Sequence, residues 1–372
     1  MLGSLITSLV GPAKPGQVAK SLKAQYDPKA TREFKLWGPY SLPGKNATHA
    51  GPGFSNGIKL DPSSDVLNGW ISPPCTDCTV LKAVANLAYK NGTQADVGTG
   101  VYTHHIIISQ VGRPQLIPPI FPVSCNSSLS GAKPSTAPKQ AGGSMAGHGH
   151  RKRQDFTSSV FVGGGGSAGS GSAFAAPNSD IKTGAYIGKY DAFQFSSEIV
   201  NYNPKEKEIY LSLDYEFLPG KTPGLMNVGM GALSVEGCAG PTAGFMPPAD
   251  KPIKYTGSEY IITENGYFVN WMPHLHDGGE KINIFLNGKD VCETKAVYGS
   301  DSGSEAVVGG SKWETISSYI PCEKAIAFKK GDKLKMTADY DLTKHRLRPD
   351  SAHSDMGAEG MALANFIWAK AV

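Results

Sequence analysis

Histidine pairs are the part of this sequence best suited to chemistry. Nine histidines are present, and two pairs lie in strand-like sequence: His104-His105 in VYTHHIIISQ, and His274 and His276 in WMPHLHDGGEKINIF. Imidazole is a poor core filler, because its ring nitrogens need partners once they leave water. Each pair is therefore explained either by a bound metal ion or by packing in the protein core.

The pair His274-x-His276 is the simpler of the two. Residues i and i+2 of a strand point to the same face, so both imidazoles are expected side by side, just before the turn at Asp277-Gly278-Gly279. This pattern predicts that the two imidazoles bind one metal ion of the borderline class, since imidazole is a suitable ligand for copper, zinc, iron or nickel. A pair of surface histidines without a ligand is the alternative.

The pair His104-His105 needs a special local geometry to bind one ion. Adjacent strand residues point to opposite faces, so both rings reach one ion only where the strand ends or bulges, or at the edge of a sheet. The alternative is one core histidine with a backbone partner and one exposed histidine.

A softer donor follows late in the chain, in HSDMGAEGMALANFIWAK. The thioether of Met356 or Met361 would select copper over zinc or magnesium. Core packing is the alternative for a methionine that begins an apolar strand.

The elements that must position these residues are strands. Runs rich in β-branched and aromatic residues alternate with turn sequences such as PGK, ENG, DGG and NGK. The pattern predicts a mostly-β protein of sandwich type. The expected strands fall within residues 99–109, 207–217, 258–271, 281–287, 316–328, 333–340 and 360–369.

One long segment has a different composition. Residues 126–180 are poor in large apolar side chains and rich in Gly, Ser, Ala and Pro, which predicts an exposed, mobile insertion. The basic stretch Arg151-Lys152-Arg153 within it is either a processing site for secretory proteases or a solvated patch.

Cysteines and sequons favour an oxidising compartment. Six cysteines fit three disulfides, and three Asn-x-Ser/Thr sequons predict glycosylation of a secreted protein. Cys75-Thr-Asp-Cys78 could also be half a zinc knuckle or a redox motif, but no second CxxC follows and no helix is opened. The residues are Cys75, Cys78, Cys125, Cys238, Cys292 and Cys322, and Asn46, Asn91 and Asn126.

The charge balance excludes some partners. Lys and Arg number 36 against 32 Asp and Glu, a net charge of +4, and no basic stripe is visible, so nucleic acid is not an expected partner. No apolar run reaches the roughly 18 residues of a transmembrane helix.

Taken in order, YTHHIII, HLHDGG and EGMALANFIW resemble the copper type II, ascorbate-dependent monooxygenases, the family of peptidylglycine alpha-hydroxylating and dopamine beta-monooxygenases. SSYIPCEKAIAFKKGDKLKMTADYD is similar to a strand pair of that family. The resemblance covers roughly residues 60–370 apart from the insertion. Plant nodulin-like proteins and fungal relatives, an offshoot of this group, carry similar strands.

The resemblance implies an all-β fold of two tandem antiparallel β-sandwich, jelly-roll-like domains with copper between them. The expected division is an N-terminal extension at 1–30, a first domain at 31–222 that contains the insertion, and a second domain at 223–372. The resemblance further implies that Cys292 pairs with Cys322. The connectivity of the other four cysteines stays open.

Carried over residue by residue, His104 and His105 would hold an electron-transfer copper, and His274, His276 and Met361 a copper that binds oxygen across a solvent-filled cleft, with ascorbate as reductant. The family's third histidine on the first copper is missing here. The matching strand EIYLSLDYEFLPG offers only Asp214, Tyr215 and Glu216, and His148 and His150 lie in the insertion.

The leading hypothesis is therefore a secreted copper oxidoreductase that activates oxygen or peroxide. A non-catalytic extracellular copper-binding or cell-wall-associated protein is the alternative, and a structural sandwich with vestigial histidines is the third.

Overall fold

The computed structural model describes residues 13–45, 47, 64–111, 120–122, 160–163, 171–176, 179–235, 245–300, 302–308, 310–322, 324–349 and 360–371. Within these ranges the regular structure is almost entirely β strand. The helical pieces described are two short 3-10 turns, η1 (Val97–Thr99) and η3 (Ser302–Ser304). The prediction of an all-β sandwich fold is confirmed.

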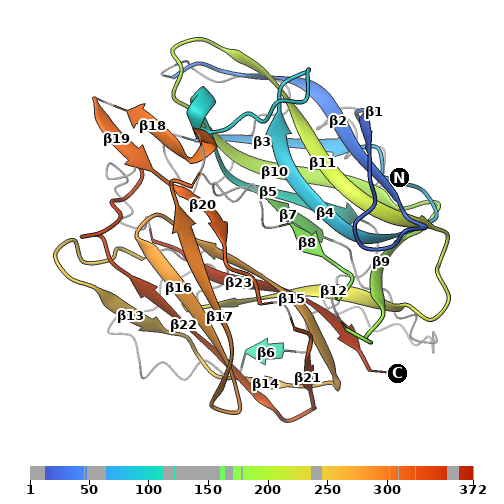
Figure 1. Ribbon diagram of the computed structural model, residues 1–372. Helices are drawn as coiled ribbons and strands as arrows, with labels where there is room; N and C mark the ends of the chain where they lie inside the picture. Colours follow the sequence, from blue (N-terminus) through green and yellow to red (C-terminus); the bar gives the residue numbers. More distant parts are fainter. Residues whose placement is uncertain are drawn as a thin grey trace, which may run out of the picture.

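Most strands of the first half of the chain belong to one large sheet, drawn blue to green in Figure 1. At one end, its main path also includes four strands that follow residue 222 in the chain, in the order β21, β15, β23 and β12. The path runs β21 (Ile326–Phe328), β15 (Gly266–Leu275), β23 (Ala362–Lys370), β12 (Met226–Ser234), β9 (Thr183–Ile187), β4 (Cys78–Ala88), β7 (Val160–Gly163), β5 (Val101–Val111), β10 (Ala192–Asn201) and β3 (Asp65–Ile71). Off this path lie β1 (Gly16–Leu22), β2 (Thr31–Leu42), β8 (Ser172–Ala173) and β11 (Lys207–Pro219).

A second sheet faces β15 and β23. Together with β12, β15, β21 and β23 it forms the lower lobe in Figure 1, and the other strands of the large sheet form the upper lobe. Its strands are β20 (Ile316–Tyr319), β17 (Lys289–Tyr298), β16 (Gly279–Leu286), β22 (Lys333–Tyr340), β14 (Tyr260–Ile262), β6 (Ile120–Pro122) and β13 (Ile253–Thr256). A separate hairpin, β18 (Glu305–Val308) and β19 (Ser311–Glu314), leaves this lobe and lies beside η1 of the upper lobe (Figure 1).

Buried and more exposed side chains alternate along many strands, because each sheet has one face on a core. One core gathers side chains mainly between Trp37 and Val228, and the other side chains between Leu233 and Trp368. The lobes are joined where β12 pairs in parallel with β9. A small third cluster, Val97, Tyr102, Val200 and Trp313, packs the hairpin against the upper lobe. The exact domain division at 222/223 stays a prediction.

Part of the expected insertion belongs to the sheet. Residues 172–173 form β8 on β4, and Phe174 is 1% exposed in the first core, so an exposed segment is wrong for residues 171–176. The Gly- and Ser-rich composition of the segment predicted exposure, although the single aromatic side chain of Phe174 is enough to bury residues 172–174. The stretch 123–159, with the Arg151–Arg153 site, His148 and His150, lies outside the described residues.

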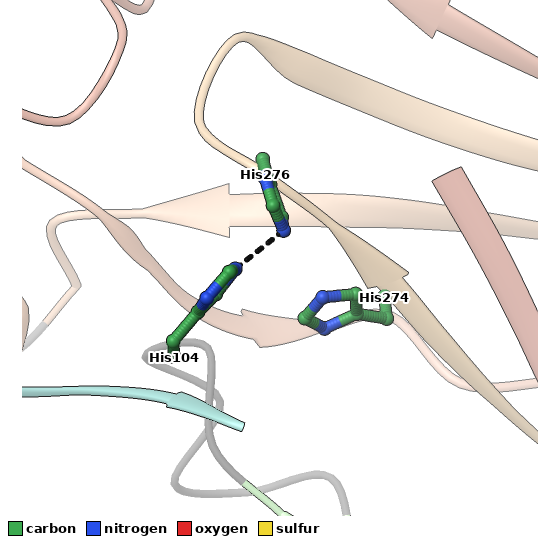
Figure 2. Close-up of side chains that lie close together, drawn as sticks. All are labelled: His104, His274 and His276. Atoms are coloured by element: carbon green, nitrogen blue, oxygen red, sulfur yellow. Dashed lines mark hydrogen bonds between the residues drawn. The ribbon is translucent and has the colours of Figure 1, made fainter. Parts of the chain in front are cut away.

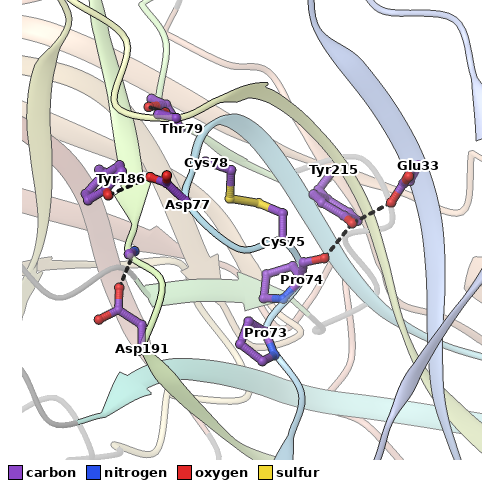
Figure 3. The surroundings of a disulfide bond; sticks show 12 residues. Glu33, Pro73, Pro74, Cys75, Asp77, Cys78, Thr79, Tyr186, Asp191 and Tyr215 are labelled. Carbon is purple, nitrogen blue, oxygen red and sulfur yellow. Dashed lines mark hydrogen bonds between the residues drawn. A yellow bond between two sulfur atoms is a disulfide. The ribbon is translucent and has the colours of Figure 1, made fainter.

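Two disulfides are present among the described residues. Cys292 pairs with Cys322, as the resemblance implied, and Cys75, in the loop that precedes β4, pairs with Cys78, the first residue of that strand. Figure 3 shows how that loop is held: Tyr186 donates a 2.8 Å hydrogen bond to Asp77, and the Tyr215 hydroxyl lies 2.7 Å from the carbonyl of Pro74. Cys125 and Cys238 lie outside the described residues.

Candidate metal centre

The end of β15 presents the first two imidazoles. His274 is in the strand and His276 follows it, with ring centroids 5.2 Å apart, as the i, i+2 spacing predicts. The chain then turns sharply at Gly278, whose φ is +93° and where a Cβ would collide with the Leu342 side chain. Only glycine fits this turn without strain, so the DGG sequence fixes where His276 stands.

Three tyrosine hydroxyls, two from buried residues and one from a half-buried residue, hold the backbone around His276. They accept hydrogen bonds from the amides of Leu275 (2.8 Å), His276 (3.2 Å) and Gly278 (3.0 Å). Burial raises the pKa of each of these tyrosines, so they stay protonated and can also donate to backbone carbonyls. The hydroxyls belong to Tyr319, Tyr340 and Tyr298 respectively.

Met361 stands opposite His276. His274 pairs with Leu363 and Leu275 with Ala362, and the His276 amide donates to the Met361 carbonyl at 3.2 Å. Cross-strand partners project from the same face, so the Met361 side chain, 5% exposed, shares the face of the two histidines. Met356 lies outside the described residues.

The second histidine pair lies at an irregularity in β5. Opposite β10, His105 pairs with Glu198 and Thr103 with Ile199, so the register passes over His104. An extra residue of this kind bends a strand and redirects a side chain. The local geometry that an adjacent pair needs is therefore present, and the two rings lie 5.0 Å apart.

His104 meets the pair from the other lobe. Its Nε2 lies 2.6 Å from His276 Nε2, and the ligand atoms of His104, His274 and His276 all lie within 4.8 Å of one another. Figure 2 shows the three rings turned toward one another. This differs from the expected arrangement, in which the two pairs hold separate coppers across a solvent-filled cleft. The lobes pack so closely here that one histidine of the first pair joins the second pair.

The remaining histidine of the pair faces a carboxylate. Glu198 Oε2 lies 3.4 Å from His104 Nδ1 and 3.7 Å from His105 Nε2, and these three residues form a second group of candidate ligands. Glu198 is 2% exposed and its other oxygen accepts a hydrogen bond from Ser64. Burial of a charged group is costly without partners. A glutamate within the apolar strand sequence AFQFSSEIVN was therefore the signal by which the sequence could have indicated Glu198.

The electrostatics favour neutral imidazoles. Burial holds the pKa of His104 well below its usual value, and His105, His274 and Arg348 lower that pKa further. Burial also holds the pKa of His274 well below 6.5, helped by His276 and His105. A neutral imidazole keeps a lone pair for a metal ion, so the site is set for ligation rather than for proton storage.

Behind His276 lies a buried polar network that reaches the hairpin. Asp277 accepts hydrogen bonds from Trp313 Nε1 (2.7 Å) and Thr315 Oγ1 (2.9 Å). Burial raises the Asp277 pKa to about 6, against the lowering effect of these donors and of Arg348. Arg348 in turn lies 5.5 Å from the Tyr102 ring centroid, two residues from His104.

The three residues considered as a replacement third ligand are engaged elsewhere. Asp214 pairs with Arg32 at 2.7 Å, Tyr215 bonds Glu33, and Glu216 accepts three backbone amides of residues 25–27. None belongs to a candidate metal group in the described part of the chain. A carboxylate does lie beside the first pair, but it comes from β10 rather than β11.

The glycosylation sites stay predictions. Asn91 is exposed in the turn after β4, while Asn46 and Asn126 lie outside the described residues. No helix in the described ranges is long and apolar enough to cross a bilayer.

No protein-family model matches the chain. It is 26% identical over 327 residues to the "Probable copper-dependent oxygenase M1" of a Phoma species, which spans 84% of this chain and 67% of that protein. It is 25% identical over 271 residues to the "Probable copper-dependent oxygenase clz3" of Cochliobolus lunatus, which spans 70% and 71%. Two solved structures of PNGF-II align with TM-scores of 0.38 and 0.39 at 10% identity, over 91% of this chain and 65% of theirs.

Proposed function

We propose that the protein is a copper-dependent oxygenase whose copper is held by His104, His274 and His276. The observation that carries the proposal is the convergence of these three rings from two lobes within 4.8 Å, two of them buried and that of His274 half-buried. Two relatives that align over most of the chain bear names of copper-dependent oxygenases, which supports the same metal and chemistry.

The donor set fits copper. Three imidazoles suit copper, zinc, iron or nickel, and a thioether beside them selects copper among these. Met361 shares the face of His274 and His276 and is the candidate for that donor. The short contact between His104 Nε2 and His276 Nε2 needs a proton on one ring; a bound ion would take the place of that hydrogen bond.

Each residue of the candidate copper site then has a definable role. Copper supplies one-electron chemistry toward oxygen or peroxide, with ascorbate or another reductant as electron source. His104, His274 and His276 bind and orient the ion, and the three tyrosine hydroxyls fix the backbone on which His276 stands. Burial of His104 and His276 limits the contact of these two ligands with bulk water, which strengthens their electrostatic effect on the ion.

The proposed setting is extracellular. The disulfides Cys75–Cys78 and Cys292–Cys322 are compatible with an oxidising compartment, and the sequons add support for secretion.

The test is metal analysis of protein loaded with copper and dialysed, followed by oxygen consumption with ascorbate. We expect bound copper and a rate above that of free copper at equal concentration. Bound copper without such a rate would favour the non-catalytic copper-binding alternative. A protein that retains no copper would contradict both.

A further inference from the structure

We propose a second metal site formed by His104, His105 and Glu198, adjacent to the copper site and joined to it through the His104 imidazole. The ligand would be a second divalent ion of the borderline class, Zn²⁺ or Cu²⁺, which accept imidazole nitrogen and carboxylate oxygen together. The inference builds on the proposed copper centre in one respect, because His104 is common to both sites.

The first argument is the direction of the two nitrogens of His104. Nε2 lies 2.6 Å from His276 Nε2, and Nδ1 lies 3.4 Å from Glu198 Oε2. The two sides of one ring therefore face two different groups of candidate ligands, each with its ligand atoms within 4.8 Å. A ring placed in this way can serve one ion with each nitrogen.

The second argument is an unsatisfied atom. His104 is 4% exposed, and its Nδ1 is fully buried without a hydrogen-bond partner. A buried ring nitrogen without a partner costs roughly 1–3 kcal/mol. The distance of 3.4 Å to Glu198 exceeds the usual N–H···O range, so a simple hydrogen bond from His104 does not explain the arrangement.

The third argument is the irregular register of β5. Because the pairing with β10 passes over His104, the neighbouring rings of His104 and His105 both approach Glu198, although they are consecutive in a strand. A carboxylate that only orients His104 would not require His105 at the same oxygen. Two imidazoles and one carboxylate at one point are instead a metal-ligand set.

The second site can be reached from solvent through its one half-buried ligand, His105. The His105 side chain is 25% exposed, while those of His104 and Glu198 are 6% and 3% exposed. An ion can therefore reach this site past His105. Coordination through both nitrogens of His104 displaces the remaining ring proton, which leaves to solvent, so loading of the second ion releases a proton.

The experiment is stepwise metal loading of the full chain, with metal per protein measured after dialysis and Cu(II) followed by electron paramagnetic resonance. With copper alone we expect two ions per chain. The second equivalent should lower the resonance intensity per copper, because the shared imidazole couples the two spins. Zn²⁺ added after one equivalent of copper should give one of each metal and an uncoupled copper signal.

Variants separate the two sites. Glu198→Gln and His105→Gln should each bind a single copper, and Glu208→Gln, an exposed carboxylate on β11, should still bind two ions. His105 is partly exposed, so His105→Gln keeps the test decisive if Glu198→Gln does not fold. Circular dichroism of the metal-free variants checks the fold.

The outcomes are distinguishable. One ion per wild-type chain, with an unchanged copper signal in His105→Gln, overturns the second site and leaves the proposed copper centre standing. No bound ion at all overturns the copper centre itself. Two ions with unaltered signal intensity would show that the sites do not share His104 and would also overturn the bridged arrangement.

Discussion

His104 is the residue on which the two halves of the candidate site depend. It comes from β5 of the upper lobe, yet its Nε2 lies against His276 of the lower lobe. A histidine pair in a strand predicts ligands, but which ring meets which partner depends on the packing of the lobes and on a local register change. Neither property is encoded in a short sequence pattern.

At the residue scale, His274→Ala should lower copper affinity by at least about tenfold, since one of three imidazoles is lost. His345→Ala is the matched control, because His345 is a partly exposed histidine of the same lobe that lies outside both candidate groups. Calorimetric titration with copper measures both variants. Equal affinity in His274→Ala and His345→Ala would contradict the three-histidine site.

Met361→Leu tests the thioether. Leucine has a similar volume, so the fold should lose less than about 1.5 kcal/mol. If sulfur contributes, affinity for Cu(I) should fall while affinity for Cu(II) changes little, because thioether is a soft donor. Competition with Cu(I) and Cu(II) chelators gives both constants. An unchanged Cu(I) affinity would assign Met361 to packing alone.

The lowered histidine pKa values make a prediction about pH and stability. Histidines in the unfolded chain take up protons near pH 6.5, whereas His104 and His274 in the folded chain do not until the pH is lower. The unfolded state then binds more protons, so the metal-free protein should lose stability as pH falls below about 6.5, by up to about 1.4 kcal/mol per pH unit for each group.

The raised pKa of Asp277, about 6, acts in the opposite direction below pH 6. A comparison of wild type with the variant His104→Asn/His274→Asn isolates the histidine contribution. Thermal unfolding of both metal-free proteins between about pH 7.5 and 5 is the measurement. The variant should show the weaker loss, and parallel curves would contradict the assignment.

At the scale of elements, the hairpin β18–β19 connects the lobes beside the site. Trp313 is 1% exposed, packs edge-to-face on Tyr102 at 5.6 Å, and donates to Asp277, which follows His276 directly. One side chain thus contacts both segments that carry the candidate ligands, which gives the hairpin a positioning role.

Trp313→Phe removes the indole N–H and leaves Asp277 with one donor fewer. We expect a stability loss of roughly 1–3 kcal/mol from the buried carboxylate and a copper affinity roughly 10- to 100-fold lower. Trp271→Phe is the control, since Trp271 is equally enclosed but its Nε1 has no hydrogen-bond partner. If both variants bind copper equally, the hairpin has only a structural role.

The strands themselves were largely predictable from sequence. Alternating β-branched and aromatic residues identified β5, β11, β15, β16, β22 and β23, because each buries one face. The hairpin at 305–314 was missed, since EAVV and SKWE are short and mixed in polarity. The role of its Trp313 depends on tertiary contacts, with Asp277 36 positions away and with Tyr102 on the other lobe, which no local pattern predicts.

At the scale of the whole molecule, the candidate site lies where two separately packed cores meet. Sequence could not give this, because His104 and His276 are 172 positions apart and nothing local encodes their contact. The pairs were recognisable as candidate ligands from their spacing, while the approach of His104 to His274 and His276 follows from the packing of the lobes.

Copper should therefore couple the lobes. Loading with copper is expected to slow amide exchange in β5 and β10 of the upper lobe as well as in β15 and β23 of the lower lobe, because binding stabilises the state in which both are in place. Hydrogen-exchange mass spectrometry shows this directly. The variant His104→Asn should confine the protection to the lower lobe, and such confinement in the wild type would contradict an interlobe site.

The central claim is that one copper ion is held by His104, His274 and His276 together. Anomalous diffraction from copper-loaded crystals, recorded on both sides of the copper absorption edge, tests it most directly. The account predicts the strongest copper peak at roughly 2 Å from one nitrogen of each of the three rings. A strongest peak bound by His274 and His276 without His104, or no copper peak among these residues, would contradict it.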